Sequence, residues 1–91
     1  MIEFSVIVFS RQNQQERLLQ SLTVLVQASR KEPGAVMYDL HSSDDGLFVI
    51  TEKWESQAAL DAHEEAVHFA DFQEKAKDLV EKVLRLPLIA I

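Results

Sequence analysis

The sequence predicts an α+β domain of the ferredoxin-like type, with the element order β-α-β-β-α-β and an antiparallel sheet. Three observations lead to this prediction. Four apolar runs have the length and alternation of strands, and two longer segments carry apolar residues at helical spacing. A turn-rich segment, 42–46, joins the second and third strand-like runs as a hairpin. The length of 91 residues leaves room for a single domain, residues 1–91.

The first strand is expected at Ile2 to Ser10, where apolar side chains fall on both faces. A helix follows over about residues 13–31. Its start is predicted at Asn13, whose side chain would cap the first turn together with Glu16. A stripe of leucines marks the buried face of this helix, and Pro33-Gly34 ends it.

The second and third strands are expected at Ala35 to His41 and Leu47 to Trp54, as antiparallel neighbours. In the third strand, Glu52 shares a face with two apolar residues and Trp54. A carboxylate on such a face lies either at the rim in water or paired inside a pocket, because an unpaired buried carboxylate is costly.

Ser56 is placed to cap the second helical segment. Two apolar stripes follow, the second reaching Val83, and the change of face between them predicts a bend near His63 to Val67. His63 and His68 lie five residues apart, so on one continuous helix they would not share a face, and no metal site is predicted. The last strand is expected at Leu84 to Ile91, interrupted by a proline.

The predicted sheet is apolar on both faces, although two helices cover only one. Apolar residues make up 47% of the chain, and leaving one face of the sheet in water would favour association. We therefore expect a homodimer in which two copies pack sheet against sheet.

Composition excludes several classes of function. The net charge of −6 disfavours nucleic acid as a partner. The absence of cysteine excludes disulfides and thiolate chemistry, and no apolar run is long enough for a membrane span. No secretion signal is recognised at the N-terminus, so a cytoplasmic protein is expected.

Trp54 at a strand end and the histidines of the next helix point into the space between sheet and helices, a usual place for a small-molecule pocket. The alternative is structural: Trp54 packs in the core, and His63 forms a hydrogen bond that holds the turn after the strand.

Five segments resemble the antibiotic biosynthesis monooxygenase (ABM) domain family, which includes small quinol monooxygenases. The segments are Glu32-Pro33-Gly34, Tyr38-Asp39-Leu40-His41, Glu52-Lys53-Trp54-Glu55-Ser56, Ala59-Leu60-Asp61-Ala62-His63 and His68-Phe69. The resemblance covers essentially the whole chain and implies a dimeric α+β barrel.

The resemblance also implies oxygenation of a quinol or hydroxylated aromatic substrate by dioxygen, with no metal, flavin or other cofactor. In that case His63 is the leading candidate for the catalytic base, and His68 and Glu52 are further catalytic candidates. The residues implied in substrate binding are Trp54, Tyr38, Phe69 and His41. The haem-degrading branch of the superfamily is rejected, because its asparagine, tryptophan and histidine are replaced here by Val6 or Ile7, by His63 and by about Gln73.

Two other functions stay open at the level of sequence. One is an isomerase of a small phosphorylated signal molecule, which would need a cationic site that scattered residues such as Lys53, Arg11 and Arg85 do not clearly supply. The other is a non-catalytic dimeric binding module, which predicts a pocket that is small or filled by side chains.

Overall fold

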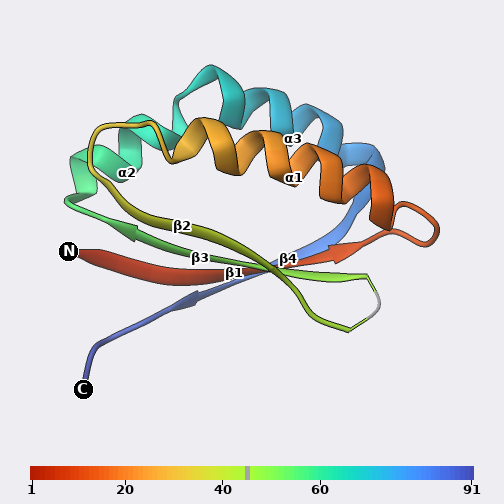
Figure 1. The fold of residues 1–91 in the computed structure, drawn as a ribbon, viewed down its shortest axis with the longest axis horizontal. Helices are drawn as coiled ribbons and strands as arrows, with labels where there is room; N and C mark the ends of the chain where they lie inside the picture. Colours follow the sequence, from red (N-terminus) through yellow and green to blue (C-terminus); the bar gives the residue numbers. More distant parts are fainter. Residues whose placement is uncertain (45) are drawn as a thin grey trace.

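The computed structural model describes residues 1–44 and 46–91. The elements follow the order β1 (Ile2–Ser10), α1 (Gln15–Ser29), β2 (Ala35–Ser42), β3 (Leu47–Trp54), α2 (Gln57–Glu64), α3 (Val67–Leu79) and β4 (Val80–Pro87). The chain therefore has the predicted ferredoxin-like arrangement, with the second helical segment split in two (Figure 1). The split falls inside the predicted bend at 63–67 and confirms it.

The four strands form one antiparallel sheet in the order β2-β3-β1-β4. Pairing of β1 with β3 sets Phe4 opposite Glu52 and Val6 opposite Ile50. Pairing of β1 with β4 sets Val6 opposite Arg85. This register places Glu52 and Arg85 on the same face of the sheet, two strands apart, because side chains directly opposite in a ladder share a face.

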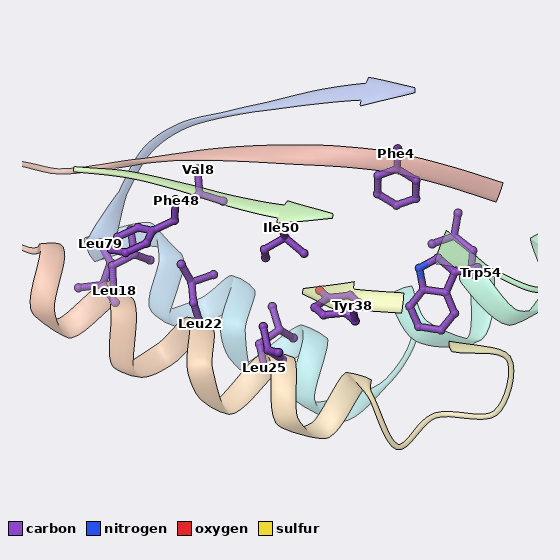
Figure 2. Close-up of a cluster of buried hydrophobic side chains, with 12 residues drawn as sticks. Phe4, Val8, Leu18, Leu22, Leu25, Tyr38, Phe48, Ile50, Trp54 and Leu79 are labelled. Atoms are coloured by element: carbon purple, nitrogen blue, oxygen red, sulfur yellow. The ribbon is translucent and has the colours of Figure 1, made fainter. Parts of the chain in front are cut away.

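The helices all lie on one face of the sheet (Figure 1). The buried core fills the space between these helices and the sheet (Figure 2). Alternate strand residues point toward α1 and α3, as the predicted period of two requires. Leu18, Leu22 and Leu25 of α1 pack against them. Figure 2 shows Trp54 and Tyr38 at the opposite end of this core from Leu18 and Leu79.

The start of α1 differs from the prediction. Asn13 does not cap the helix: it takes a left-handed φ of 65° within the preceding turn. Gln14 occupies the cap position without a side-chain hydrogen bond. The turn is closed instead by backbone, since the Gln14 amide donates to the Arg11 carbonyl at 3.1 Å. Asparagine tolerates the left-handed region better than most residues, which explains its place there.

The last strand also differs from the prediction. It begins at Val80, directly after α3, and ends at Pro87, so the predicted bounds of Leu84 to Ile91 were wrong by four residues at each end. Val83 therefore belongs to a strand opposite Val8, not to the end of the helix. The predicted Asp45-Gly46 hairpin signal falls partly on Asp45, which lies outside the described residues.

The turn between α1 and β2 is closely packed against α2. Gly34 has a φ of +85°, and a Cβ at this position would lie 2.6 Å from the Ala59 Cβ. Only glycine fits here, because both the backbone conformation and the space exclude a side chain. The Gly34 carbonyl accepts a hydrogen bond from the Glu55 amide at 2.8 Å, so the turn is fixed beside α2.

Among the described residues, no helix covers the other face of the sheet (Figure 1). Leu84 of β4 is 45% exposed there, opposite Ile7 of β1, and Leu86 is 48% exposed, opposite Ser5. No helix among the described residues is long and apolar enough to cross a membrane.

Candidate functional site

A cavity of about 520 Å³ opens between the helices and the sheet. This volume lies in the range of small-molecule sites. Its wall is largely apolar, and the residues that form it come from all four strands and all three helices: Phe4, Val6, Val8, Leu22, Leu25, Tyr38, Ile50, Glu52, His63, Glu64, Phe69, Phe72, Gln73, Ala76, Lys77, Val80, Val83 and Arg85. The cavity thus offers a long apolar wall with a small number of polar groups.

His63 supplies the polar group of most chemical interest. Its side chain is 1% exposed, and its Nδ1 lies 2.6 Å from Oε2 of Glu32. His68 Nε2 lies 2.8 Å from the same oxygen. A carboxylate oxygen only accepts hydrogen bonds, so both ring nitrogens must carry the hydrogen that they direct at Glu32. This assigns the neutral form of His63 as the Nδ1–H tautomer.

The second ring nitrogen of His63 is then a free acceptor. His63 Nε2 is buried, and within the described residues it has no hydrogen-bond partner. Buried polar atoms are rarely left unpaired, and one without a partner in a cavity wall calls for an explanation. Tyr38, Trp54 and Phe69 surround the ring, with centroids 5.3, 4.6 and 5.0 Å away.

The local sequence explains why the three polar residues meet. Ser56 caps α2 by accepting a hydrogen bond from the Ala59 amide at 3.1 Å, as predicted. The chain leaves the helical conformation at Ala66, which is extended, and α3 begins at Val67. This break turns His68 back toward His63, while the fixed turn at Gly34 carries Glu32 between them.

A second polar pair, Glu52 and Trp54, lies beside the histidine. Trp54 Nε1 donates a 2.9 Å hydrogen bond to Glu52 Oε1, and both side chains are buried. Glu52 is thus paired inside a pocket and does not lie at the rim. Burial raises the pKa of Glu52 to about 7, against the opposing effects of the Trp54 hydrogen bond and of Arg85. Burial and the nearby Glu52 raise the pKa of Tyr38, which keeps its hydroxyl protonated.

Because the folded pKa of Glu52 exceeds the usual value of 4.5, its contribution to stability is complete below pH 4.5 and is lost as the pH rises through about 7. Wild type should therefore lose about 2 to 3 kcal/mol relative to Glu52→Gln between pH 5 and pH 8. Urea unfolding of both proteins at the two pH values measures this difference. If the difference in unfolding free energy between the two proteins does not change with pH, the pKa of Glu52 is not raised.

An ion pair at the edge of the cavity connects β4 to α2. Arg85 lies 3.3 Å from Glu64, and its guanidinium carbon lies 3.8 Å from the ring centre of Phe4. Both charged groups are about half exposed, so the pair contributes little to stability. The pair affects the charge of the cavity, because it holds the Arg85 guanidinium beside the polar end of the cavity.

Only some of the site residues proposed from the sequence line the cavity. Tyr38, Glu52, His63 and Phe69 line the cavity. Trp54 lies behind the wall, where it holds Glu52 and packs on His63, and His68 lies behind His63 at Glu32. His41 is exposed and sits on the other face of the sheet from Tyr38, so it does not reach the cavity.

Sequence reasoning gave no role to two residues of the site, Glu32 and Arg85. Glu32 appeared only as the first residue of a segment that resembles the family, and nothing in its spacing connects it with histidines 31 and 36 residues later. Arg85 was considered only as a scattered cation. Its alternation with Val83 in a strand starting at Val80 would have placed it on the cavity face.

Comparison with known proteins agrees with the fold. The model of a family described as “Antibiotic biosynthesis monooxygenase” matches residues 7–75. The Bacillus subtilis protein named “Putative monooxygenase YcnE” is 35% identical over 82 residues, covering 88% of this chain and 86% of the relative.

Two solved structures show the same architecture. PA3566 from Pseudomonas aeruginosa superimposes with a TM-score of 0.94 at 29% identity, covering 99% of this chain and 93% of that one. Rv0793 from Mycobacterium tuberculosis gives a TM-score of 0.90 at 25% identity, covering 99% and 94%.

Proposed function

Since the chain belongs to the antibiotic biosynthesis monooxygenase family, we propose that it oxygenates a quinol or related hydroxylated aromatic molecule, with dioxygen as co-substrate and no cofactor. The observation that carries this proposal is the buried Nε2 of His63, which has no partner among the described residues and belongs to a side chain that lines an apolar cavity. A phenolic hydroxyl placed there would donate to this nitrogen, while its ring would lie against the apolar wall.

The chemistry begins with removal of the hydroxyl proton by His63 Nε2. The resulting phenolate is electron-rich enough to reduce dioxygen, so the substrate itself supplies the electrons. For a simple hydroquinone, one quinol and one dioxygen give one hydroxyquinone and one water: one oxygen atom bonds to a ring carbon, and the other leaves as water. The protein binds the ring, accepts the proton and keeps bulk water from the reacting atoms.

Glu32 keeps His63 in the tautomer whose Nε2 can accept a proton. Its carboxylate accepts the Nδ1 hydrogen at 2.6 Å, which orients the ring and stabilises the imidazolium that forms when Nε2 takes a proton. His68 bonds to the same oxygen and is 25% exposed, so it connects the buried group with solvent. Glu52 and Tyr38 lie next to this centre and are suited to bind a second oxygen of the substrate.

Oxygen uptake with a panel of hydroquinones and hydroxynaphthalenes tests the proposal. Uptake with the purified, cofactor-free protein should exceed autoxidation and yield one oxygenated product per dioxygen consumed. Uptake no greater than autoxidation for every member of the panel would contradict it. The open cavity argues against the non-catalytic module, which predicts a filled or small pocket.

We further propose that a second copy of the chain covers the open face of the sheet. Support comes from the apolar side chains gathered there on β1 and β4, and from the residue Leu86, which is 48% exposed although it lies within a strand. Burying such a face is favourable by about 25 cal/mol for each Å² of apolar area removed from water.

Replacing Leu84 with lysine should convert this dimer to a monomer. Leu84 is 45% exposed in a single chain, so a lysine there costs the monomer little but would bury a charge between two sheets. Light scattering after gel filtration should give twice 10.4 kDa for wild type and 10.4 kDa for the variant. The control is Val24→Lys on α1, also exposed but away from the sheet, which should remain dimeric. A monomeric wild type would overturn this proposal.

A further inference from the structure

The residues Glu32, His63 and His68 form a compact group of metal-binding atoms. One ligand atom from each residue lies within 4.8 Å of the others. The three come from three separate elements: the turn after α1, the end of α2 and the start of α3. The spacing of the two histidines excluded a metal pair only for a continuous helix, and the break between α2 and α3 removes that objection.

We propose that these three side chains bind one divalent transition-metal ion, with Zn²⁺ as the representative case. Two imidazole nitrogens and a carboxylate oxygen are a common ligand set for this class of ion. Ligand atoms around a tetrahedral Zn²⁺ lie about 3.3 Å apart, so the two separations between Glu32 and the histidines, 2.6 and 2.8 Å, need to widen by well under 1 Å. The two histidine nitrogens, which lie within 4.8 Å of each other, would need to approach each other around the ion. Glu32 is on a turn and can supply this movement through its side chain.

The surroundings favour such an ion. Glu32 places a carboxylate oxygen beside both imidazoles, and metal binding would replace the two hydrogens now directed at that oxygen. The group is not sealed, because His68 is 25% exposed and Glu32 is 13% exposed, which leaves an entry path and room for a water as fourth ligand.

The ion would lie behind the cavity and not within it. Neither Glu32 nor His68 lines the cavity, and the metal would bind His63 through Nδ1, on the side of the ring away from the free Nε2. A neutral imidazole that binds a metal through Nδ1 carries its hydrogen on Nε2. His63 would then have no lone pair to offer a substrate hydroxyl, and the metal would inhibit. This consequence rests on the proposed function, whereas the binding site does not.

Equilibrium dialysis of the tag-free protein against micromolar Zn²⁺ tests the site. Wild type should bind one ion per chain, and His68→Ala should bind it at least about tenfold more weakly. His41→Ala is the matched control, because it removes an exposed histidine from the other face of the sheet and should bind like wild type. Circular dichroism establishes that each variant is folded. Equal affinity in His68→Ala, or no binding by wild type, would overturn the proposal.

Two further readings complete the experiment. Co²⁺ in place of Zn²⁺ should give the visible absorption of a four-coordinate site in wild type, and Glu32→Gln should weaken or abolish it. Unchanged absorption in Glu32→Gln would exclude the carboxylate as a ligand. Where a substrate is found, Zn²⁺ should inhibit oxygen uptake over the same concentrations at which it binds. Binding without any activity would refute the proposed function alone, and activity without binding would refute the metal site alone.

Discussion

Replacement of His63 by glutamine is expected to lower kcat for oxygenation by about 10² to 10³-fold, the range typical for loss of a general base. Glutamine has a similar volume, and its amide can still donate to Glu32. Its amide oxygen can accept a hydrogen bond but cannot take up a proton near neutral pH, so the basic nitrogen at Nε2 is lost. Oxygen uptake at saturating substrate measures the effect.

A second variant separates a catalytic role of His63 from a structural one. His63→Ala leaves space beside Trp54, Tyr38 and Phe69 in which free imidazole fits. Added imidazole should restore part of the rate to the alanine variant and none to glutamine, which fills the space. His41→Ala should retain the wild-type rate, because His41 does not reach the cavity. A folded glutamine variant with a wild-type rate would show that His63 is not the base.

Replacement of Trp54 by alanine is expected to reduce the free energy of unfolding by about 3 to 5 kcal/mol. Trp54 is fully buried, packs on Tyr38 and His63, and donates the hydrogen bond that pairs Glu52. Its removal leaves both a cavity and a buried carboxyl without its donor. For a small domain, whose total stability is about 5 to 15 kcal/mol, this is a large fraction.

Urea unfolding followed by far-ultraviolet circular dichroism measures this loss, since Trp54 is the only tryptophan and its fluorescence disappears with it. Trp54→Phe should lose less unfolding free energy than Trp54→Ala, because phenylalanine keeps part of the packing. Val24→Ala on the exposed face of α1 is the control and should change stability by less than about 0.5 kcal/mol. A loss below about 1 kcal/mol in Trp54→Ala would mean that the indole is not a structural centre of the core.

Patterns of period two and 3.6 predicted most of the fold. The bounds of β1 and β3 agree with the structure residue for residue, because apolar alternation in a sheet covered by helices leaves little freedom of register. Prediction failed where neighbouring residues suit either structure. Val80 and Val83 extend the helical stripe, whereas Val83 and Arg85 alternate as a strand, and only the pairing of Val83 with Val8 of β1 decides for the strand.

Part of the cavity lining also follows from periodicity along single elements. His63, Glu52, Tyr38 and Phe69 lie on faces that short-range periodicity directs toward the space between sheet and helices. The position of His41 in the motif suggested a role in the site, but its place in β2 turns it to the opposite face. Glu32 could not be found from periodicity, because its partner His63 lies 31 residues away in the chain.

The amino-acid sequence by itself determined which side chains face the helices, the hairpin of β2 and β3, and the presence of a histidine beside Trp54. Only the tertiary structure decided that His63 presents a free Nε2, since the turn at Gly34 and the break between α2 and α3 bring Glu32 and His68 to its other nitrogen. The physical reason is range: periodicity along one element fixes its faces, whereas the tautomer and the environment of a side chain depend on residues that only folding brings close.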